Sequence, residues 1–272
     1  MTLPARIPAL VSLALVSLAL CLAAPALAAP KSQKLEEQNR PSQEEMQNQE
    51  ALKYYQFGNQ YFQQGLLRQA EEALRKALQL QPAYPDASYL LGLVLIELND
   101  YRGAIAEAQK ALQQNPFLTE AHNLMGLALA KMGNTDAAIK EFEAVKADVS
   151  FPTPEVAHFN IGKVFWEKQS CGEAVVHFRR ALEINNQFWR AWYLLGDCQE
   201  QLGQLGLAKT SYEKALAIEP NEVAPMYRLG YVCFQERDMA CARKCFTSVR
   251  DLAPSTDMAA GAREYLRQME FR

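Results

Sequence analysis

The feature that most constrains this chain is a glycine that recurs about every 34 residues along most of its length. Successive spacings are 34, 34, 36, 34 and 34 residues, and a bulky apolar residue precedes the glycine each time. The six pairs are Phe57-Gly58, Leu91-Gly92, Met125-Gly126, Ile161-Gly162, Leu195-Gly196 and Leu229-Gly230. A fixed period of this length is typical of an array in which one small structural unit is stacked repeatedly.

Other positions keep the register of the glycine. An alanine stands twelve residues after each glycine, and a bulky residue stands sixteen residues after it in five of the six units. The bulky residues are Leu74, Phe142, Phe178, Tyr212 and Phe246, and Ala108 takes the sixth place. Glycine and alanine at matched heights let two antiparallel helices approach closely, while the bulky residues fill the space between them. Each unit is therefore predicted to be one helical hairpin.

This pattern resembles the tetratricopeptide repeat, and it covers most of the chain. The resemblance implies an all-α fold, a right-handed superhelical solenoid of six repeats plus a C-terminal capping helix. The predicted repeats span 51–84, 85–118, 119–152, 155–188, 189–222 and 223–256, and the predicted capping helix spans 257–272. Two extra residues near Phe151 and Pro152 predict a longer connection between the third and fourth repeats.

The first 28 residues have the pattern of an export signal. Arg6 is their only charge, a long apolar run follows it, and Ala26-Leu27-Ala28 has the small residues that signal peptidase requires. We predict a signal peptide at 1–28 and a polar tether at 29–50, where apolar side chains are few. A frayed helical extension is the alternative for the tether.

Cys21 leaves a second processing route open. Leu18-Ala19-Leu20-Cys21 resembles a bacterial lipobox, although Leu20 is bulkier than that pattern prefers. Cleavage after Ala28 would place the chain in the bacterial periplasm, whereas acylation of Cys21 would also tether it to the outer membrane. No second apolar run of spanning length follows, so membrane contact is expected only through such a lipid.

The first helix of each repeat has positions that packing does not require, and we expect these positions to line the concave face. They are unusually apolar in this chain. The predicted partner-binding groove consists of Tyr55, Phe62, Tyr89, Leu93, Ile96, Phe159, Trp166, Tyr193, Tyr227, Tyr231 and Phe234. An exposed apolar face of this extent is costly in water unless a peptide or helix covers it, so the groove predicts a protein partner.

The sequence has none of the motifs that would indicate an enzyme. It contains no H-E-x-x-H, no glycine-rich phosphate loop and no G-x-S-x-G, so we predict neither catalytic residues nor a cofactor. His122, His158 and His177 have no companions at metal-ligand spacing, and we predict no metal site. A formal charge of −3 and a pI near 5.8 disfavour nucleic acid as a partner.

Five cysteines lie beyond the predicted signal peptide, all within the last three repeats. An exported chain keeps disulfides, and a stacked array would bring Cys171 and Cys198 to the same end, so we predict a bond between them. Cys233 faces the second helix of its own repeat, where either Cys241 or Cys245 could pair with it and leave one thiol over.

An exported six-repeat array with a tether, a candidate lipobox and a capping helix is similar to the type IV pilus pilotins. The resemblance implies a scaffold that assists assembly of the outer-membrane secretin, with a secretin segment in the groove. The alternative is a periplasmic repeat scaffold for outer-membrane protein assembly, cytochrome maturation or polysaccharide export. Trp166→Ala is expected to weaken capture by about 1 to 3 kcal/mol if Trp166 is a hot spot. The sequence predicts no oligomeric state.

Overall fold

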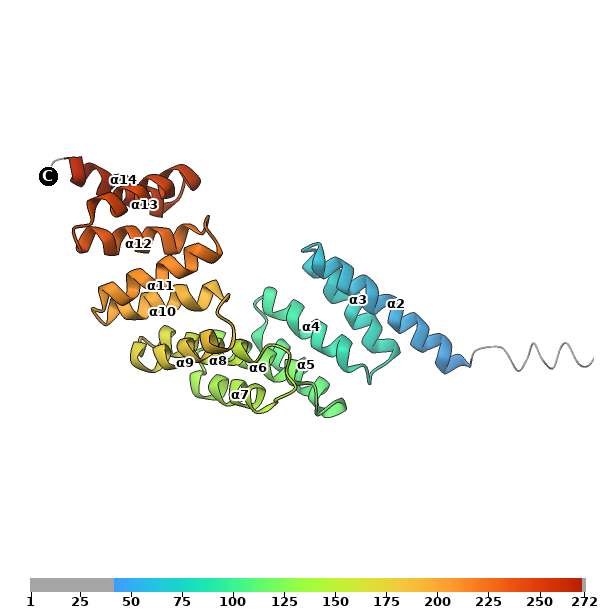
Figure 1. Cartoon of the computed structure of the whole chain (residues 1–272). Coiled ribbons are helices and arrows are strands. Elements are labelled where there is room, and N and C mark those ends of the chain that lie inside the picture. The colour runs from blue at the N-terminus through green and yellow to red at the C-terminus, as the bar shows by residue number, and fades with distance from the viewer. Residues whose placement is uncertain (1–41, 271–272) are drawn as a thin grey trace, which may run out of the picture. The chain divides into compact units, whose positions relative to one another are not determined.

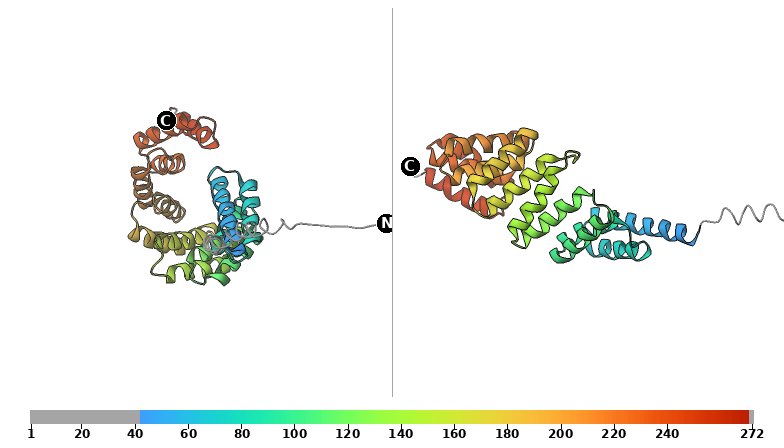
Figure 2. Two further views of the ribbon diagram at one scale, coloured as in Figure 1. Left: turned by 90° about the vertical axis from the view of Figure 1, so that its right-hand side faces the viewer. Right: turned by 90° about the horizontal axis from the view of Figure 1, so that it is seen from below.

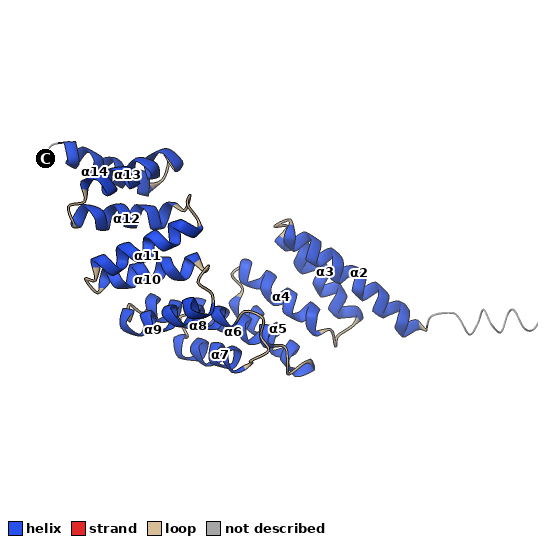
Figure 3. Cartoon of the chain, in the orientation of Figure 1, coloured by secondary structure: helices blue, strands red, loops and turns tan. Residues whose placement is uncertain are grey.

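The computed structural model describes residues 42–270, and this part of the chain consists of helices joined by short loops (Figure 3). The helices are α2 (Gln43–Gln63), α3 (Leu67–Leu80), α4 (Pro85–Glu97), α5 (Tyr101–Gln114), α6 (Thr119–Lys131), α7 (Thr135–Ala147), α8 (Pro154–Glu167), α9 (Cys171–Ile184), α10 (Trp189–Gln201), α11 (Leu205–Ile218), α12 (Val223–Gln235), α13 (Met239–Leu252) and α14 (Asp257–Glu270). No described residue lies in a strand. No helix in this range is both long enough and apolar enough to cross a membrane.

Consecutive helices pack as hairpins, and consecutive hairpins pack on one another (Figures 1 and 2). In the unit that starts at Glu50, each even-numbered helix from α2 to α12 opens a repeat and the next helix closes it. The closing helix also contacts the opening helix of the following repeat, as α5 does with α6 and α9 with α10. Helix α14 packs on α13 after the last repeat. The predicted all-α solenoid of six repeats with a capping helix is confirmed.

The periodic glycines lie where the two helices of a repeat come closest. A methyl group on Gly196 would lie 2.7 Å from the Tyr212 ring, and one on Gly230 would lie 2.9 Å from the Phe246 ring. Both rings are fully buried. In the second repeat the bulky partner is missing, and Leu124 of the next repeat fills the space beside Gly92 instead. The close approach that the spacing predicts is therefore kept even where the repeat pattern lapses.

All six turns inside the repeats contain one residue with left-handed backbone, seven positions after the repeat glycine. Three of them are glycines, Gly65, Gly133 and Gly203, with φ between 72° and 77°. The other three are Asn99, Gln169 and Arg237, with φ between 59° and 63°. A left-handed residue ends one helix and turns the chain toward the next, and glycine adopts it without steric cost. Because only half of these positions are glycine, the sequence pattern did not reveal the shared turn.

Helix α2 begins eight residues before the predicted first repeat. Residues 43–50 of the predicted tether are helical, so the alternative of a helical extension holds for them, and the part of the tether up to residue 41 lies outside the described residues. The cause is a capping box: the Glu45 backbone N–H donates to Ser42 Oγ at 3.1 Å, and the Ser42 N–H donates to Glu45 Oε2 at 2.6 Å. The predicted signal peptide and Cys21 also lie outside the described residues.

The connection between α7 and α8 runs over residues 148–153, whereas the other repeats are joined by four residues. Its Phe151 is buried against Val145 and Ala157. The Thr119 hydroxyl of α6 donates to Asp148 Oδ2 at 2.5 Å and holds the start of the connection. The longer connection therefore packs as part of the fold.

Candidate functional site

The eleven residues predicted to form the groove lie on the opening helices of five repeats, and we call them the inner strip. Every one of them is half-buried. Each also packs against a hydrophobic core cluster, so the expectation that these positions are not required for packing is wrong. Leu93 and Ile96, for example, each contact the clusters of both the second and third repeats. Each side chain of the inner strip therefore packs on the core with one side and faces solvent with the other.

The strip residues of the first half lie in the first two repeats and are apolar or aromatic. The rings of Tyr55 and Tyr84 lie 5.2 Å apart between centroids, and Tyr89 packs with Leu93 and Ile96 on the next cluster. Burial raises the pKa of Tyr55, and the nearby Asp86 carboxylate raises it further. Tyr55 is therefore neutral at physiological pH. This half offers apolar contact and phenol hydroxyls, without a fixed charge among its strip residues.

Aromatic rings also connect the strip residues of the last three repeats. Phe159 lies 4.6 Å from Phe188 between ring centroids. Tyr265 of the capping helix lies 6.0 Å from Tyr231 and 5.1 Å from Phe234. Two of the predicted groove residues are therefore partly covered by α14. This contact was not predicted, because Tyr265 lies beyond the sixth repeat in the capping helix.

A network of charged and polar side chains lies beside this aromatic surface. Trp166 Nε1 donates to Asp197 Oδ2 at 2.7 Å, so α8 is joined to α10. Arg228 of α12 donates to Glu200 Oε1 at 2.6 Å and also lies 3.4 Å from Asp197. Tyr212 of α11 donates to Glu200 Oε2 at 2.9 Å. One cation thus faces two carboxylates, and the three last repeats share one set of bonds.

The network lies mostly out of water. Asp197 is only 8% exposed. Burial raises the pKa of Glu200, while the charge of Arg228 lowers it. Trp166 is held through its indole N–H, so Trp166 supports the fold as well as the surface. Asp197, Glu200 and Arg228 were not predicted as site residues. They could have been found from the sequence, because they are charged residues on opening helices that are otherwise apolar.

The three histidines contact other side chains within the fold. His122 Nδ1 lies 2.7 Å from Glu141 Oε2 across the two helices of the third repeat. His158 and His177 face each other with ring centroids 5.7 Å apart, and their Nδ1 atoms are buried without a hydrogen bond. Burial lowers the pKa of both rings, and the charge of Lys146 lowers it further. None of the three belongs to a cluster of metal-ligand residues within the described range.

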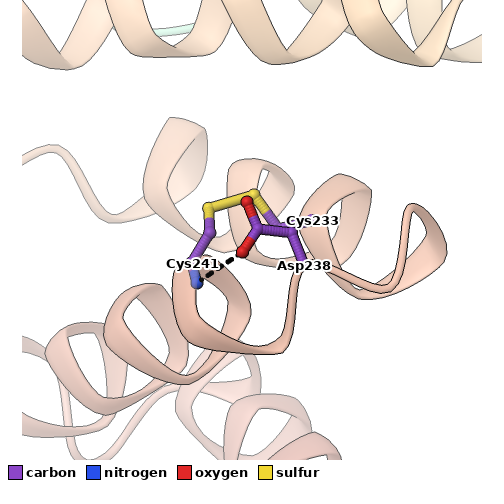
Figure 4. A group of neighbouring side chains, drawn as sticks. All are labelled: Cys233, Asp238 and Cys241. Carbon is purple, nitrogen blue, oxygen red and sulfur yellow. Dashed lines mark hydrogen bonds between the residues drawn. A yellow bond between two sulfur atoms is a disulfide. The ribbon is translucent and has the colours of Figure 1, made fainter.

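The cysteines pair differently from one of the predictions. Cys233 and Cys241 form a disulfide with Cα atoms 5.9 Å apart, one of the two pairings left open for Cys233 (Figure 4). Cys171 and Cys198 are buried thiols, so the predicted bond between them is wrong for this structure. The Cys171 thiol donates a hydrogen bond to Gln201 Oε1 at 3.3 Å instead. Burial raises the pKa of the Cys198 thiol, and contact with Cys171 raises it further.

Asp238 lies next to the disulfide at the start of α13 (Figure 4). Its Oδ1 accepts the Cys241 backbone N–H at 3.1 Å, and its Oδ2 accepts Lys209 Nζ at 2.9 Å. Cys233, Cys241 and Asp238 are also the one group in the described range with metal-ligand atoms close together. Both sulfur atoms are used in the disulfide, so the group acts as a helix cap and a cross-link.

Some hollows in the described surface lie away from the inner strip. Four of them, of about 170 to 560 Å³, are lined by other residues, chiefly on the closing helices. The strip residues lie half-exposed along the opening helices. An open apolar strip suits a peptide or helix better than a small molecule, which needs an enclosing cavity.

Family models agree with the repeat pattern. Models described as tetratricopeptide repeat match residues 55–119, 123–187 and 190–222. The chain belongs to the tetratricopeptide repeat family. This family's fold is a scaffold for protein interaction. A search among curated proteins finds no match.

Solved structures of similar fold include two that are matched over almost their full length. The first, from a study entitled functional characterization of Pseudomonas aeruginosa pilF, is 20% identical with a TM-score of 0.70, and the match covers 82% of this chain and 99% of the other. The second is PilW, described as a widely conserved type IV pilus biogenesis factor, at 21% identity and a TM-score of 0.70, covering 78% and 97%. A third, the Cut9-Hcn1 hetero-tetramer of APC/C, is 17% identical with a TM-score of 0.66, covering 79% of this chain but 42% of the other. At these identities the likeness concerns the fold.

Proposed function

We propose that this protein is an exported scaffold that assists assembly of an outer-membrane secretin for type IV pili. The observation that carries the proposal of a protein partner is the inner strip, with eleven apolar or aromatic residues left half-exposed on the opening helices. The choice of a pilus system is supported by the likeness in fold to PilW, which extends over 97% of the PilW chain. The export-signal pattern of residues 1–28 supports a periplasmic location.

The strip suggests how a secretin segment would be held. In the first three repeats Tyr89, Leu93 and Ile96 would cover apolar side chains of the segment, which removes them from water before the secretin subunits meet. In the last three repeats the rings would contact the segment while Asp197, Glu200 and Arg228 hold their helices in place. A scaffold of this kind lowers the chance of aggregation by covering surface that the multimer later buries.

The decisive experiment measures the ratio of secretin multimer to monomer in membranes of the source organism. Deletion of the gene should lower the multimer fraction, and the wild-type gene should restore it. Leu93→Glu with Tyr89→Ala should fail to restore it, because the apolar contact is lost. The matched control is Leu207→Glu, which changes an exposed leucine of α11 outside the strip. An unchanged multimer fraction in the deletion strain would overturn the pilus proposal.

Capture on the immobilised protein identifies the partner directly. Outer-membrane extract should yield the secretin on the wild-type chain, and Trp166→Ala with Phe159→Ala should lose it. Trp166→Phe keeps a ring but removes the bond to Asp197, so it separates the surface role of the residue from its structural role. Enrichment of a barrel-assembly, cytochrome-maturation or polysaccharide-export component in place of the secretin would favour the alternative periplasmic scaffold.

A related measurement concerns processing. Mass spectrometry of the mature protein from cells should find an N-terminus at Ala29 or an acylated Cys21. Retention of residues 1–28 on a protein that stays in the cytoplasm would contradict the proposed export.

A further inference from the structure

The first repeat exposes a residue that every other repeat buries. Phe57, which precedes the first repeat glycine, is 49% exposed. Its counterparts Leu91, Met125, Ile161, Leu195 and Leu229 are 0%, 9%, 0%, 3% and 7% exposed. In those five repeats a preceding closing helix covers this side of the opening helix, and among the described residues α2 has no such neighbour. Among the described residues, therefore, nothing takes the place beside Phe57 that a preceding closing helix takes in the other repeats.

The surroundings of Phe57 extend this surface. Tyr54 and Tyr61 lie on the same side of α2, and the Tyr54 ring meets the Phe57 ring edge-on with centroids 6.5 Å apart. These three rings and Ala73 line a hollow of about 170 Å³ between α2 and α3. Glu72 and Lys76 of α3 stand at its rim, 3.1 Å apart, with Lys76 Nζ 5.7 Å from the Tyr54 ring centre. We call this surface the N-terminal edge patch.

The other end of the solenoid is finished differently. Helix α14 buries Ala259, Ala262 and Met269 against the rest of the fold. Its outer side presents exposed polar residues, among them Glu264 and Arg267, which form an ion pair. A polar outer face on a terminal helix is what keeps a repeat array soluble. This outer side of α14, in the described part of the chain, therefore offers little apolar surface to the N-terminal edge patch of another copy.

The chain's own preceding segment also has little to offer the patch. Residues 29–41 contain a single large apolar side chain, Leu35. One leucine offers little apolar area with which to cover three aromatic rings. The apolar signal residues before it are removed if the export proposal holds, so they are not available either.

We propose that the N-terminal edge patch is a dimer interface between two copies of this chain, related by a two-fold axis near Phe57. An interface of this symmetry must be complementary to itself. The N-terminal edge patch is self-complementary in this sense. Tyr54 and Tyr61 flank Phe57 at similar spacing, so Tyr54 of one copy would meet Tyr61 of the second copy. Glu72 and Lys76 have opposite charges one helical turn apart, so antiparallel α3 helices would set each Glu72 against the Lys76 of the second copy. The pairing restores to Phe57 the cover that a preceding repeat provides elsewhere.

The test is sedimentation velocity of the full chain as purified from cells, over a wide concentration range. The wild type should show a reversible dimer. Phe57→Glu should weaken self-association by roughly 100-fold, because it places a charge at the centre of the interface. The control is Phe117→Glu, a residue 91% exposed in the loop between α5 and α6, and this variant should dimerise as the wild type does. Circular dichroism should show the same helix content in all three.

A second measurement locates the contact. Equal amounts of ¹⁴N and ¹⁵N protein are mixed and treated with a carbodiimide, which joins carboxylates to nearby amines. Glu72–Lys76 links that combine a ¹⁴N and a ¹⁵N peptide support the two-fold arrangement. A wild-type chain that remains monomeric at the highest concentration, or a dimer that Phe57→Glu and Phe117→Glu affect equally, would overturn the proposal. Because dimerisation is measured without a secretin, its failure leaves the proposed function standing.

Discussion

The first three repeats and the last three share one backbone pattern but are joined by different side-chain chemistry. Between the first and second repeats the side-chain hydrogen bond to the neighbouring repeat runs from Gln114 to the Pro82 carbonyl, at 2.9 Å. Between the fifth and sixth, Arg228 bonds Glu200 and Lys209 bonds Asp238. The comparison teaches that glycine and alanine spacing specifies the hairpins, while residues outside the repeat pattern specify how firmly neighbouring hairpins are held.

The residues that fill the hairpins differ between the first two repeats and the last four. Phe142, Phe178, Tyr212 and Phe246 are the buried aromatic fillers of the last four repeats, whereas Leu74 fills the first and Leu124 of the third repeat fills the second. The last repeat also has the Cys233–Cys241 disulfide. A ring that is both packed and hydrogen-bonded, like Tyr212, can shift less than a leucine side chain when a neighbour is changed. We therefore expect the last three repeats to respond more strongly to substitution.

The largest difference is expected at Arg228. Arg228→Met leaves Asp197 and Glu200 facing each other without a cation, and removal of one partner from a buried ionic group costs about 3 to 5 kcal/mol. The matched control in the first half is Arg75→Met, which removes an exposed pair with Glu71 worth at most about 0.5 kcal/mol. Urea unfolding followed by circular dichroism measures both. Equal losses in the two variants would contradict the comparison.

Loss of the disulfide should rank next. Cys233 and Cys241 enclose a short loop, with a sequence separation of 8, and replacing both by alanine should lower the free energy of unfolding by about 2.5 kcal/mol. The same loss should follow when the wild type is unfolded in the presence of reductant, and the double variant should not respond to reductant. A wild type whose stability ignores reductant would show that the bond contributes nothing.

A smaller effect is expected at the glycines that face the fillers. Gly196→Ala would press a methyl group against the Tyr212 ring, which Glu200 holds, and should cost about 1 to 3 kcal/mol. Gly58→Ala meets Leu74, a flexible side chain, and should cost less. Gly206→Ala has its nearest atom at 3.9 Å and serves as the control, since alanine there should be neutral or slightly stabilising. Thermal unfolding of the three variants tests this order, and an equal loss at Gly58 and Gly196 would count against it.

The smallest effect should depend on pH. Burial lowers the pKa of His158 and His177, so the folded chain binds fewer protons than the unfolded chain near the ordinary histidine pKa of about 6.5. The stability that these neutral rings contribute is present above that value and is lost as the pH falls below it. Replacing both with phenylalanine should make the free energy of unfolding less dependent on pH between about 5 and 7. A free energy of unfolding that depends more steeply on pH in the variant would contradict the lowered pKa of the two histidines.

Much of the fold could be predicted because the repeat pattern is local. Gly196 and Tyr212 are sixteen residues apart in one hairpin, so their contact is encoded within a single repeat and recurs with the period. The left-handed turn residue was harder, because Asn99, Gln169 and Arg237 adopt the backbone that glycine adopts in the other repeats. The start of α2 was misplaced because polar composition concealed the Ser42–Glu45 capping box.

The candidate site could be predicted less completely. The eleven strip residues were found by position, and the structure places all of them half in and half out of the core. Their part in packing was not foreseen, since it depends on neighbours from adjoining repeats. Tyr231 and Phe234 illustrate this: their cover comes from Tyr265 of the capping helix, which stands one repeat period of 34 residues after Tyr231 but beyond the sixth repeat.

The sequence by itself determined that this chain is an array of six helical hairpins with an apolar strip on their opening helices. Period and residue size suffice for that, because every hairpin contains the residues that close it. Only the tertiary structure decided that Cys233 pairs with Cys241, that Arg228 faces two carboxylates, and that Phe57 is exposed among the described residues. Those outcomes depend on which side chains meet across a turn or between hairpins, and on which repeat has no neighbour, and a periodic pattern treats all repeats alike.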